Sequence, residues 1–137
     1  MNKLIIYTDG GARGNPGPAA IGVAVYEAGK PNNPVKTLSK VIGHTTNNQA
    51  EYHALLAGLQ LAEQLRAEEV VCYLDSELVV KQLNGQYKVK DAGLKEIVPQ
   101  IFKAQNQFRK IEFKHVPREK NKLADQLVNE ALDKAGH

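Results

Sequence analysis

The order of hydrophobic patterns along the chain constrains its fold more than any other feature. Three short apolar segments rich in Val, Ile and Tyr come first, and the spacing of apolar residues then changes to that of a helix. A strand, two helices, a strand and a last helix follow. The expected strands are residues 4–8, 20–28, 35–43, 70–74 and 111–116. The expected helices are residues 48–67, 76–83, 94–108 and 121–135. In the third, Pro99 would either cause a kink or mark a later start. The expected buried stripe of the last helix is Ala124, Leu127, Val128, Ala131 and Ala135.

This order predicts the fold class. Strands joined by short turns form an antiparallel meander, whereas the fourth and fifth strands can return to the same sheet only through helical crossovers that cover its faces. We therefore predict an α/β fold with a five-stranded mixed sheet, antiparallel in its first three strands and flanked by helices on both faces. The 137 residues, 42% of them hydrophobic, suffice for one domain, which we place at 1–137.

The bulk composition narrows the cellular setting. The net charge of +3 is compatible with a polyanionic partner but does not demonstrate one. The single cysteine, Cys72, excludes an internal disulfide and is expected to be buried in its apolar run. The chain shows neither a signal peptide nor an apolar stretch of membrane-spanning length, so we expect a cytoplasmic protein without a membrane partner.

Four acidic residues stand where a sheet of this kind places ligands. Asp9 and Asp75 each follow an apolar strand, while Glu51 and Asp125 each stand next to a core alanine on a helix. If the first and fourth strands are neighbours, Asp9 and Asp75 share one pocket, because parallel strands lie about 4.8 Å apart. Each acid alone also fits a turn or a solvated helix position, so the interpretation depends on their joint placement.

Such a cluster of carboxylates repels itself unless cations neutralise it. Mg²⁺ prefers oxygen ligands, and two such ions about 4 Å apart stabilise both the attacking and the leaving oxygen in phosphoryl displacement. The cluster therefore favours metal-assisted hydrolysis of a phosphodiester.

The loop GGARGNPGP, which follows Asp9, matches no common phosphate loop. It lacks the Gly-Lys-Ser/Thr of a P-loop, its glycines do not form G-x-G-x-x-G, and a strand rather than a helix comes next. A haloacid-dehalogenase-type phosphatase would need a second acid at Gly11. What remains is a turn whose small residues let the backbone of a bulky ligand approach closely.

Four motifs then carry a resemblance, in the order YTDGGARGNPGPAAIGVAVY, TTNNQAEYHALLAGL, YLDSELVVKQLNG and NKLADQLVNEAL. Together they resemble ribonuclease H of type 1 over nearly the whole chain. The resemblance implies the ribonuclease H-like fold and a monomer that binds RNA–DNA hybrids. It also implies an endoribonuclease that hydrolyses the RNA strand to 5′-phosphate and 3′-hydroxyl ends. A hybrid-binding module without catalysis and a nuclease for double-stranded RNA remain alternatives.

By this resemblance the four acids are metal ligands. Asp9 would bridge two Mg²⁺ ions, which Mn²⁺ can replace. Asp125 would help hold the ion that activates the attacking water, and Glu51 and Asp75 would serve the ion at the leaving 3′ oxygen. No protein nucleophile is implied.

The resemblance also implies contacts with the hybrid. They fall on small or polar residues near the acids, namely Gly10, Gly11, Asn15, Thr46, Asn47, Asn48 and Glu77. Thr46 and Asn47 would grip a phosphate of the DNA strand, and either also fits the cap of the following helix. Glu77 is a departure, because many relatives have a neutral glutamine there that contacts the RNA.

Two further departures concern basic side chains. Many relatives have a basic protrusion where this chain has only Tyr87, Lys88 and Lys90, which either replace it weakly or form a solvated loop. Many also have a mobile histidine before the last acid. Here His115 or Arg118 could take that role, and we favour Arg118 because His115 is expected to belong to a strand; a plain surface arginine is the alternative.

Overall fold

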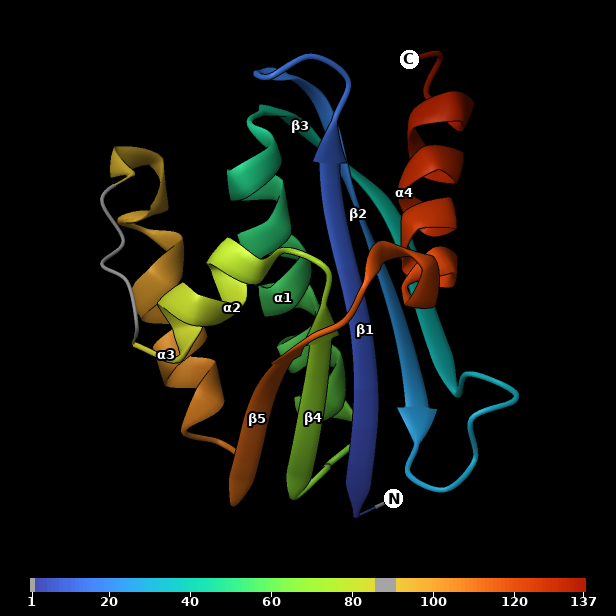
Figure 1. Ribbon diagram of the computed structural model, residues 1–137, viewed down its shortest axis with the longest axis vertical. Coiled ribbons are helices and arrows are strands. Elements are labelled where there is room, and N and C mark those ends of the chain that lie inside the picture. The colour runs from blue at the N-terminus through green and yellow to red at the C-terminus, as the bar shows by residue number, and fades with distance from the viewer. Residues whose placement is uncertain (1, 86–90) are drawn as a thin grey trace.

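The structure is a computed structural model that describes residues 2–85 and 91–137. Its five strands form one sheet in the order β3-β2-β1-β4-β5 (Figure 1). They are β1 Lys3–Ala12, β2 Gly17–Glu27, β3 Lys36–Thr45, β4 Glu69–Leu74 and β5 Lys110–His115. The pairs β1–β2 and β2–β3 are antiparallel, and β1–β4 and β4–β5 are parallel. The predicted mixed sheet, antiparallel in its first three strands, is therefore confirmed.

Helices cover both faces of this sheet, as predicted. The four α-helices are α1 Asn47–Gln64, α2 Glu77–Leu83, α3 Ile97–Gln105 and α4 Lys122–Lys134. Two short 3-10 helices are η1 Ala92–Leu94 and η2 Arg118–Lys120. Helix α1 packs on β1 and β2 with α3 against it, whereas α4 packs alone on the opposite face, over β1, β2 and β3 (Figure 1).

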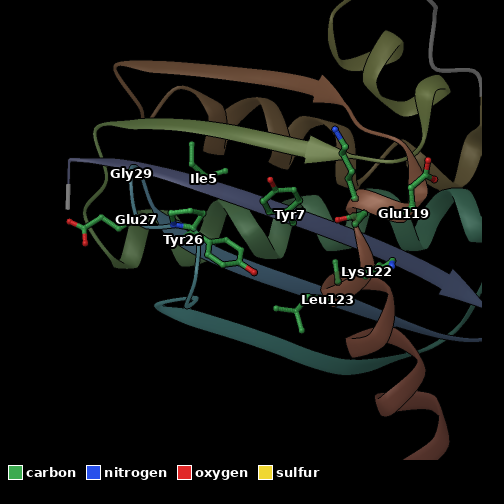
Figure 2. A pocket seen from close by; sticks show the side chains of 12 residues that line it. Ile5, Tyr7, Tyr26, Glu27, Gly29, Glu119, Lys122 and Leu123 are labelled. Atoms are coloured by element: carbon green, nitrogen blue, oxygen red, sulfur yellow. The ribbon is translucent and has the colours of Figure 1, made fainter.

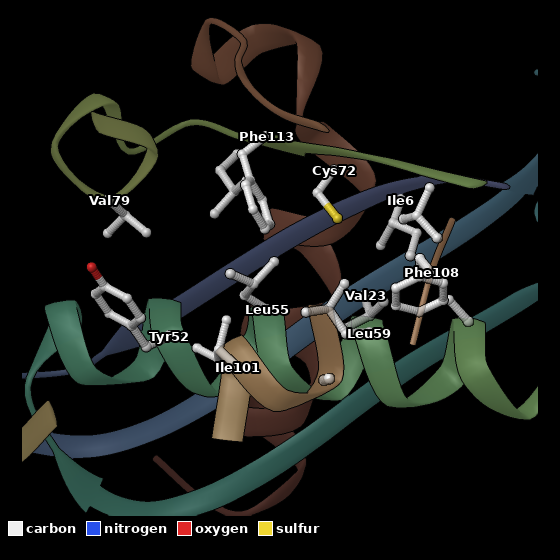
Figure 3. Packing of buried hydrophobic residues seen from close by; sticks show 14 of the residues in the cluster. Ile6, Val23, Tyr52, Leu55, Leu59, Cys72, Val79, Ile101, Phe108 and Phe113 are labelled. Atoms are coloured by element: carbon white, nitrogen blue, oxygen red, sulfur yellow. The ribbon is translucent and has the colours of Figure 1, made fainter. Parts of the chain in front are cut away.

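The main hydrophobic core lies between the sheet and α1 (Figure 3). Side chains from the strands meet side chains from α1 and α3 there, among them Ile6, Val23, Tyr52, Leu55, Leu59, Cys72 and Ile101. Cys72 is fully buried, which confirms its expected place in the core. The cluster beneath α4 is much smaller and consists of Ala20, Val128, Ala131 and Leu132.

Local sequence signals explain where the helices begin. The hydroxyl of Thr46 accepts a hydrogen bond from the backbone N–H of Gln49, so Thr46 caps α1. Ser76 caps α2 in the same way through Val79 N–H. Helix α3 has the late start that was one of the two alternatives for Pro99, which fits only the first turn of a helix.

Strand β1 runs further than its apolar pattern predicted. We expected it to end at Asp9, but pairing with β2 continues to Ala12 opposite Ala19. The prediction was wrong because the hairpin partner, not side-chain hydrophobicity, supplies the backbone hydrogen bonds beyond residue 8. Asp9 consequently lies inside the central strand of the sheet.

The end of the last helix also differs from the prediction. Ala135 was assigned to the buried stripe of the last helix, but it is exposed beyond the end of α4, and Leu132 is buried instead. The basic candidates Tyr87, Lys88 and Lys90 lie outside the described residues. Within the described ranges, no helix is both long enough and apolar enough to cross a membrane.

Candidate metal centre

All four predicted acids line one hollow at the carboxyl ends of β1 and β4. Its volume is ≈ 660 Å³, and Arg118 lies on its rim together with residues of the β1–β2 turn and of α4. Strands β1 and β4 are parallel neighbours with Thr8 opposite Leu74, so the residues that follow, Asp9 and Asp75, stand next to each other. The predicted convergence of the acids on one end of the sheet is therefore present.

Three of the acids form a tighter group. Asp9, Glu51 and Asp75 each offer one carboxylate oxygen, and these atoms all lie within 4.8 Å of one another. Asp9 and Glu51 are buried, each 8% exposed, whereas Asp75 and Asp125 are half-buried. The group is thus a pocket with a deep side and an open side.

Gly10 explains how Glu51 reaches this group. A Cβ atom at Gly10 would lie 2.1 Å from the backbone oxygen of Ala50, so only glycine lets α1 approach β1 this closely. The N–H of Gly10 then donates to Oε1 of Glu51 at 3.1 Å. We had interpreted this glycine as room for a ligand backbone, but its first use is to seat a helix.

Gly22 does the same on the other face of the sheet. It pairs with Asp9 in the β1–β2 register, and a Cβ atom there would lie 2.2 Å from the backbone oxygen of Ala124. Helix α4 therefore approaches β2 closely enough for Asp125, which follows Ala124, to line the hollow. Asp9 therefore lies beside two close helix–sheet approaches, at Gly10 and Gly22, and each brings an acid towards it.

Burial perturbs the deep carboxyls. Burial, together with the negative charges of Asp75 and Asp125, raises the pKa of Asp9 to about 7, although a hydrogen bond with Glu51 opposes this rise. Burial, followed by the adjacent Asp9, also raises the pKa of Glu51 well above its usual range. In the absence of a cation, Asp9 would therefore bind a proton near neutral pH, and Glu51 would hold a proton more tightly than an exposed glutamate does.

These residues fit a hard divalent cation. Oε2 of Glu51 is buried and has no hydrogen-bond partner among the described residues, although it belongs to a group that prefers a charged partner. The ligand atoms of the group are carboxylate oxygens, the donor type that Mg²⁺ prefers, and the group contains no histidine or cysteine ligand. A cation between the acids would satisfy the orphaned oxygen and neutralise their charge.

The chain is similar to known proteins over nearly its whole length. The family model described as reverse transcriptase-like matches residues 7–131. A ribonuclease H of Chromohalobacter salexigens is 36% identical over 153 aligned residues, covering 97% of this chain and 86% of its own length. The chain belongs to the ribonuclease H family.

Other ribonuclease H relatives agree in fold. The crystal structure of LC11-RNase H1 in complex with an RNA/DNA hybrid superposes with a TM-score of 0.89 at 47% identity, covering 98% of this chain and 99% of that one. The bifunctional protein Rv2228c of Mycobacterium tuberculosis is 46% identical over 134 residues. This chain spans 36% of the length of Rv2228c. The predicted ribonuclease H-like fold is thus confirmed.

Most hybrid contacts predicted from the ribonuclease H resemblance line the same hollow. They are Gly10, Gly11, Asn15, Asn47 and Asn48. Asn15 and Asn47 also join the β1–β2 turn to α1, because Asn47 N–H donates to Oδ1 of Asn15 at 3.0 Å and Ala12 N–H donates to Oδ1 of Asn47 at 2.8 Å. Their other amide atoms have no partner among the described residues and remain available to a ligand.

Two predicted contacts lie apart from the ribonuclease H hollow. Among the described lining residues, neither Thr46 nor Glu77 appears. Thr46 caps α1, which was the alternative explanation for it, and the exposed Glu77 carboxylate pairs with Lys81 at 2.7 Å. Arg118 lines the hollow, whereas His115 is exposed at the end of β5, within the strand as expected. Their roles in binding or catalysis stay predictions.

Two residues of this ribonuclease H site were not predicted from the sequence. Arg13 lines the hollow and pairs with Asp133 of α4 at 2.7 Å, which holds the β1–β2 turn against that helix. Asn121 is 1% exposed and donates a hydrogen bond to Asp75. Arg13 stands in the quoted glycine-rich loop, so its charge was visible, but nothing local marked Asn121 as buried.

A second hollow of ≈ 290 Å³ lies on the face of the sheet that carries α4. Tyr7 and Tyr26 form one wall, and residues from η2 and the start of α4, including Glu119, Lys122 and Leu123, form another (Figure 2). None of the four predicted metal ligands lines it, so it is not part of the metal centre.

Proposed function

We propose that this chain is an endoribonuclease that hydrolyses the RNA strand of RNA–DNA hybrids. The observation that carries the proposal is the group of Asp9, Glu51 and Asp75, whose oxygens lie within 4.8 Å of one another in a hollow shared with Asp125. Membership of the ribonuclease H family supports the substrate class. The hybrid-bound structure of LC11-RNase H1 supports it too.

The four acids are proposed to hold two Mg²⁺ ions, which Mn²⁺ can replace. When bound, two such cations would stabilise the attacking and the leaving oxygen of the phosphodiester. The family resemblance implies 5′-phosphate and 3′-hydroxyl products. By the family resemblance, Asp9 would help to hold both cations. Asp125 is assigned to the ion on the water side, and Glu51 and Asp75 to the other.

The residues of the chain itself place these charges. The Gly10 N–H holds Glu51 through Oε1, and Oε2 has no hydrogen-bond partner among the described residues. Exclusion of water around Asp9 and Glu51 strengthens their electrostatic interaction with a cation. Arg118, on the rim, is assigned a contact with the cleaved phosphate or a proton transfer beside it.

The hybrid is proposed to bind along the rim of the hollow. Proteins recognise the RNA strand of an A-like duplex through 2′-hydroxyls and base edges in a wide, shallow minor groove. The exposed amides of Asn15 and Asn47 and the backbone at Gly11 are short groups suited to such a surface. A monomeric, single-domain and cytoplasmic protein is part of the proposal.

The test is a substrate panel with metal titration. End-labelled RNA–DNA hybrid, double-stranded RNA and double-stranded DNA of one sequence are incubated with Mg²⁺, Mn²⁺ or EDTA at fixed salt. We expect cleavage of the hybrid RNA strand only, with either metal and not in EDTA. Hybrid binding without metal-dependent cleavage would favour a binding module, and equal cleavage of double-stranded RNA would change the substrate class.

A further inference from the structure

Asn121 is a buried polar residue to which the proposed chemistry assigns no role. It precedes α4, and its side chain lies between β1 and the residue that follows β4, with 1% of its surface exposed. Its Nδ2 group donates to the backbone oxygen of Thr8 at 2.9 Å and to Oδ2 of Asp75 at 3.1 Å. Both amide hydrogens are therefore used.

These bonds join three segments that carry acids. Thr8 immediately precedes Asp9 on β1, and Asp75 immediately follows β4. The backbone oxygen of Asn121 accepts the N–H of Asp125 at 3.1 Å, in the first turn of α4. One residue thus fixes the relative positions of three proposed ligands.

Asp75 has more need of such support than the deep acids. It stands beyond the last residue of β4, so the strand ladder does not hold it. Among the described residues, Asn121 is the sole hydrogen-bond partner of its carboxylate. Asn121 therefore holds the carboxylate of Asp75 by a donated hydrogen bond, as the Gly10 N–H holds that of Glu51.

The chemistry of an amide suits this position. A lysine would neutralise Asp75 and compete with a cation, whereas a neutral amide orients the carboxylate and leaves its charge intact. Oδ1 of Asn121 is buried without a partner among the described residues, which is unfavourable. The hydrogen-bond donors of the side chain are thus what the site uses.

We propose that Asn121 is a positioning residue that orients Asp75 for divalent-cation binding. The inference rests on the proposed function, because it takes Asp75 to be a metal ligand. Asn121 would act through Asp75, without a contact of its own with the substrate. Loss of an outer-shell partner of this kind lowers metal affinity by about 10- to 100-fold.

The experiment measures Mg²⁺ binding directly, by isothermal titration calorimetry of the protein without nucleic acid. Asn121→Ala removes both donors, and Asn121→Ser leaves one hydroxyl hydrogen, which cannot serve two acceptors. We expect both variants to raise the Kd for Mg²⁺ by about 10- to 100-fold. Circular dichroism melting sets an assay temperature at which each variant is folded, and Asn121→Ser covers the case in which the larger truncation unfolds.

Asn84→Ala is the matched control. The Nδ2 group of Asn84 also donates to a strand carbonyl, that of Phe113 at 3.3 Å, but Asn84 is not in the described lining of the hollow. It is expected to leave the Kd for Mg²⁺ unchanged. In the hybrid cleavage assay, Asn121→Ala is expected to regain most of its kcat at high Mg²⁺, with an unchanged KM for the hybrid.

A double-mutant cycle identifies the route of the effect. In an Asp75→Asn background, Asn121→Ala is expected to change the Kd for Mg²⁺ by less than about twofold, since coupled residues are not additive. Wild-type protein that binds no Mg²⁺ would contradict the proposed function itself. Wild-type protein that binds Mg²⁺ while both Asn121 variants bind it equally well would overturn this inference alone.

Discussion

The two halves of the carboxylate group occupy different environments. Asp9 lies on the central strand and Glu51 on α1, and each is 8% exposed. Asp75 follows the end of β4, and Asp125 lies in the first turn of α4, which covers a much smaller core. Both acids are half-buried. The deep pair therefore carries most of the desolvation cost, and the outer pair faces the solvent from which a substrate arrives.

The deep pair therefore affects the stability of the fold, whereas the outer pair is accessible to a substrate. Carboxylates taken out of water destabilise the folded state unless a cation or a proton neutralises them. The raised pKa values of Asp9 and Glu51 express that cost. The outer acids can change their surroundings when substrate binds without unfolding the core. Without a cation, removal of a deep acid should therefore change the stability of the fold more than removal of an outer acid does.

The largest expected effect is on activity. Asp9→Asn removes the central ligand and is expected to lower cleavage of the hybrid by about 10³-fold or more, the scale of transition-state stabilisation by a bound cation. In EDTA at pH 8 the same variant is expected to melt at a higher temperature than wild type, because a buried charge is gone. Cleavage is measured with labelled hybrid, and melting by circular dichroism.

Glu63→Gln is the control for Asp9→Asn, since Glu63 is an exposed acid on α1. It should change neither the activity nor the melting temperature. Near-normal cleavage by Asp9→Asn would remove Asp9 from the metal centre.

The next effect concerns the support beneath the deep pair. Gly10→Ala would place a Cβ atom 2.1 Å from the Ala50 oxygen, so α1 must move away from β1. We expect a loss of about 3 kcal/mol in the free energy of unfolding, the upper range for overpacking. Gly11→Ala meets its nearest atom, on Val128, at 3.6 Å, an ordinary contact, and should cost less than about 1 kcal/mol.

Urea unfolding at fixed pH measures both glycine variants. A similar loss for the two would show that the close approach at Gly10 does not seat the helix.

The smallest expected effect is the pH dependence of stability without divalent cations. The pKa of Asp9 is about 7 in the folded chain, against about 4 for an ordinary aspartate, so between these values the folded state holds a proton that the unfolded chain releases. The free energy of unfolding therefore falls as pH rises from about 4 to about 7. Relative to Asp9→Asn, wild type should lose stability over that range in EDTA.

Asp125→Asn sharpens this test of the deep pair. It removes only a neighbouring charge and should retain most of the decline with pH, whereas Asp9→Asn should show a smaller one. Urea titrations at intervals from pH 4 to pH 8 give the comparison. Equal slopes for wild type and Asp9→Asn would place the perturbed proton elsewhere.

The sequence predicted the elements better than it predicted their ends. The alternation of patterns placed all five strands, and the Ser and Thr caps marked the starts of two helices. It failed at Asp9, because strand length beyond residue 8 depends on pairing with β2. It also placed Ala135 in the core, where the helix had already ended.

The site was predictable where residue type alone indicates chemistry. Four acids beside strand ends and core alanines pointed to one pocket, and all four line it. Asn121 was not predictable, because a buried asparagine and a solvated one look alike in a sequence. The purpose of Gly10 was also hidden, since a close approach involves Ala50, a residue far along the chain.

The sequence by itself determined the order of the strands and helices, the identity of the four acids and the resemblance to one family, because these follow from residue type and local spacing. The tertiary structure alone decided which acids are deep and which are open, and which glycine and amide groups hold them. These depend on how closely segments from distant parts of the chain approach, and that distance is set by packing of the whole fold.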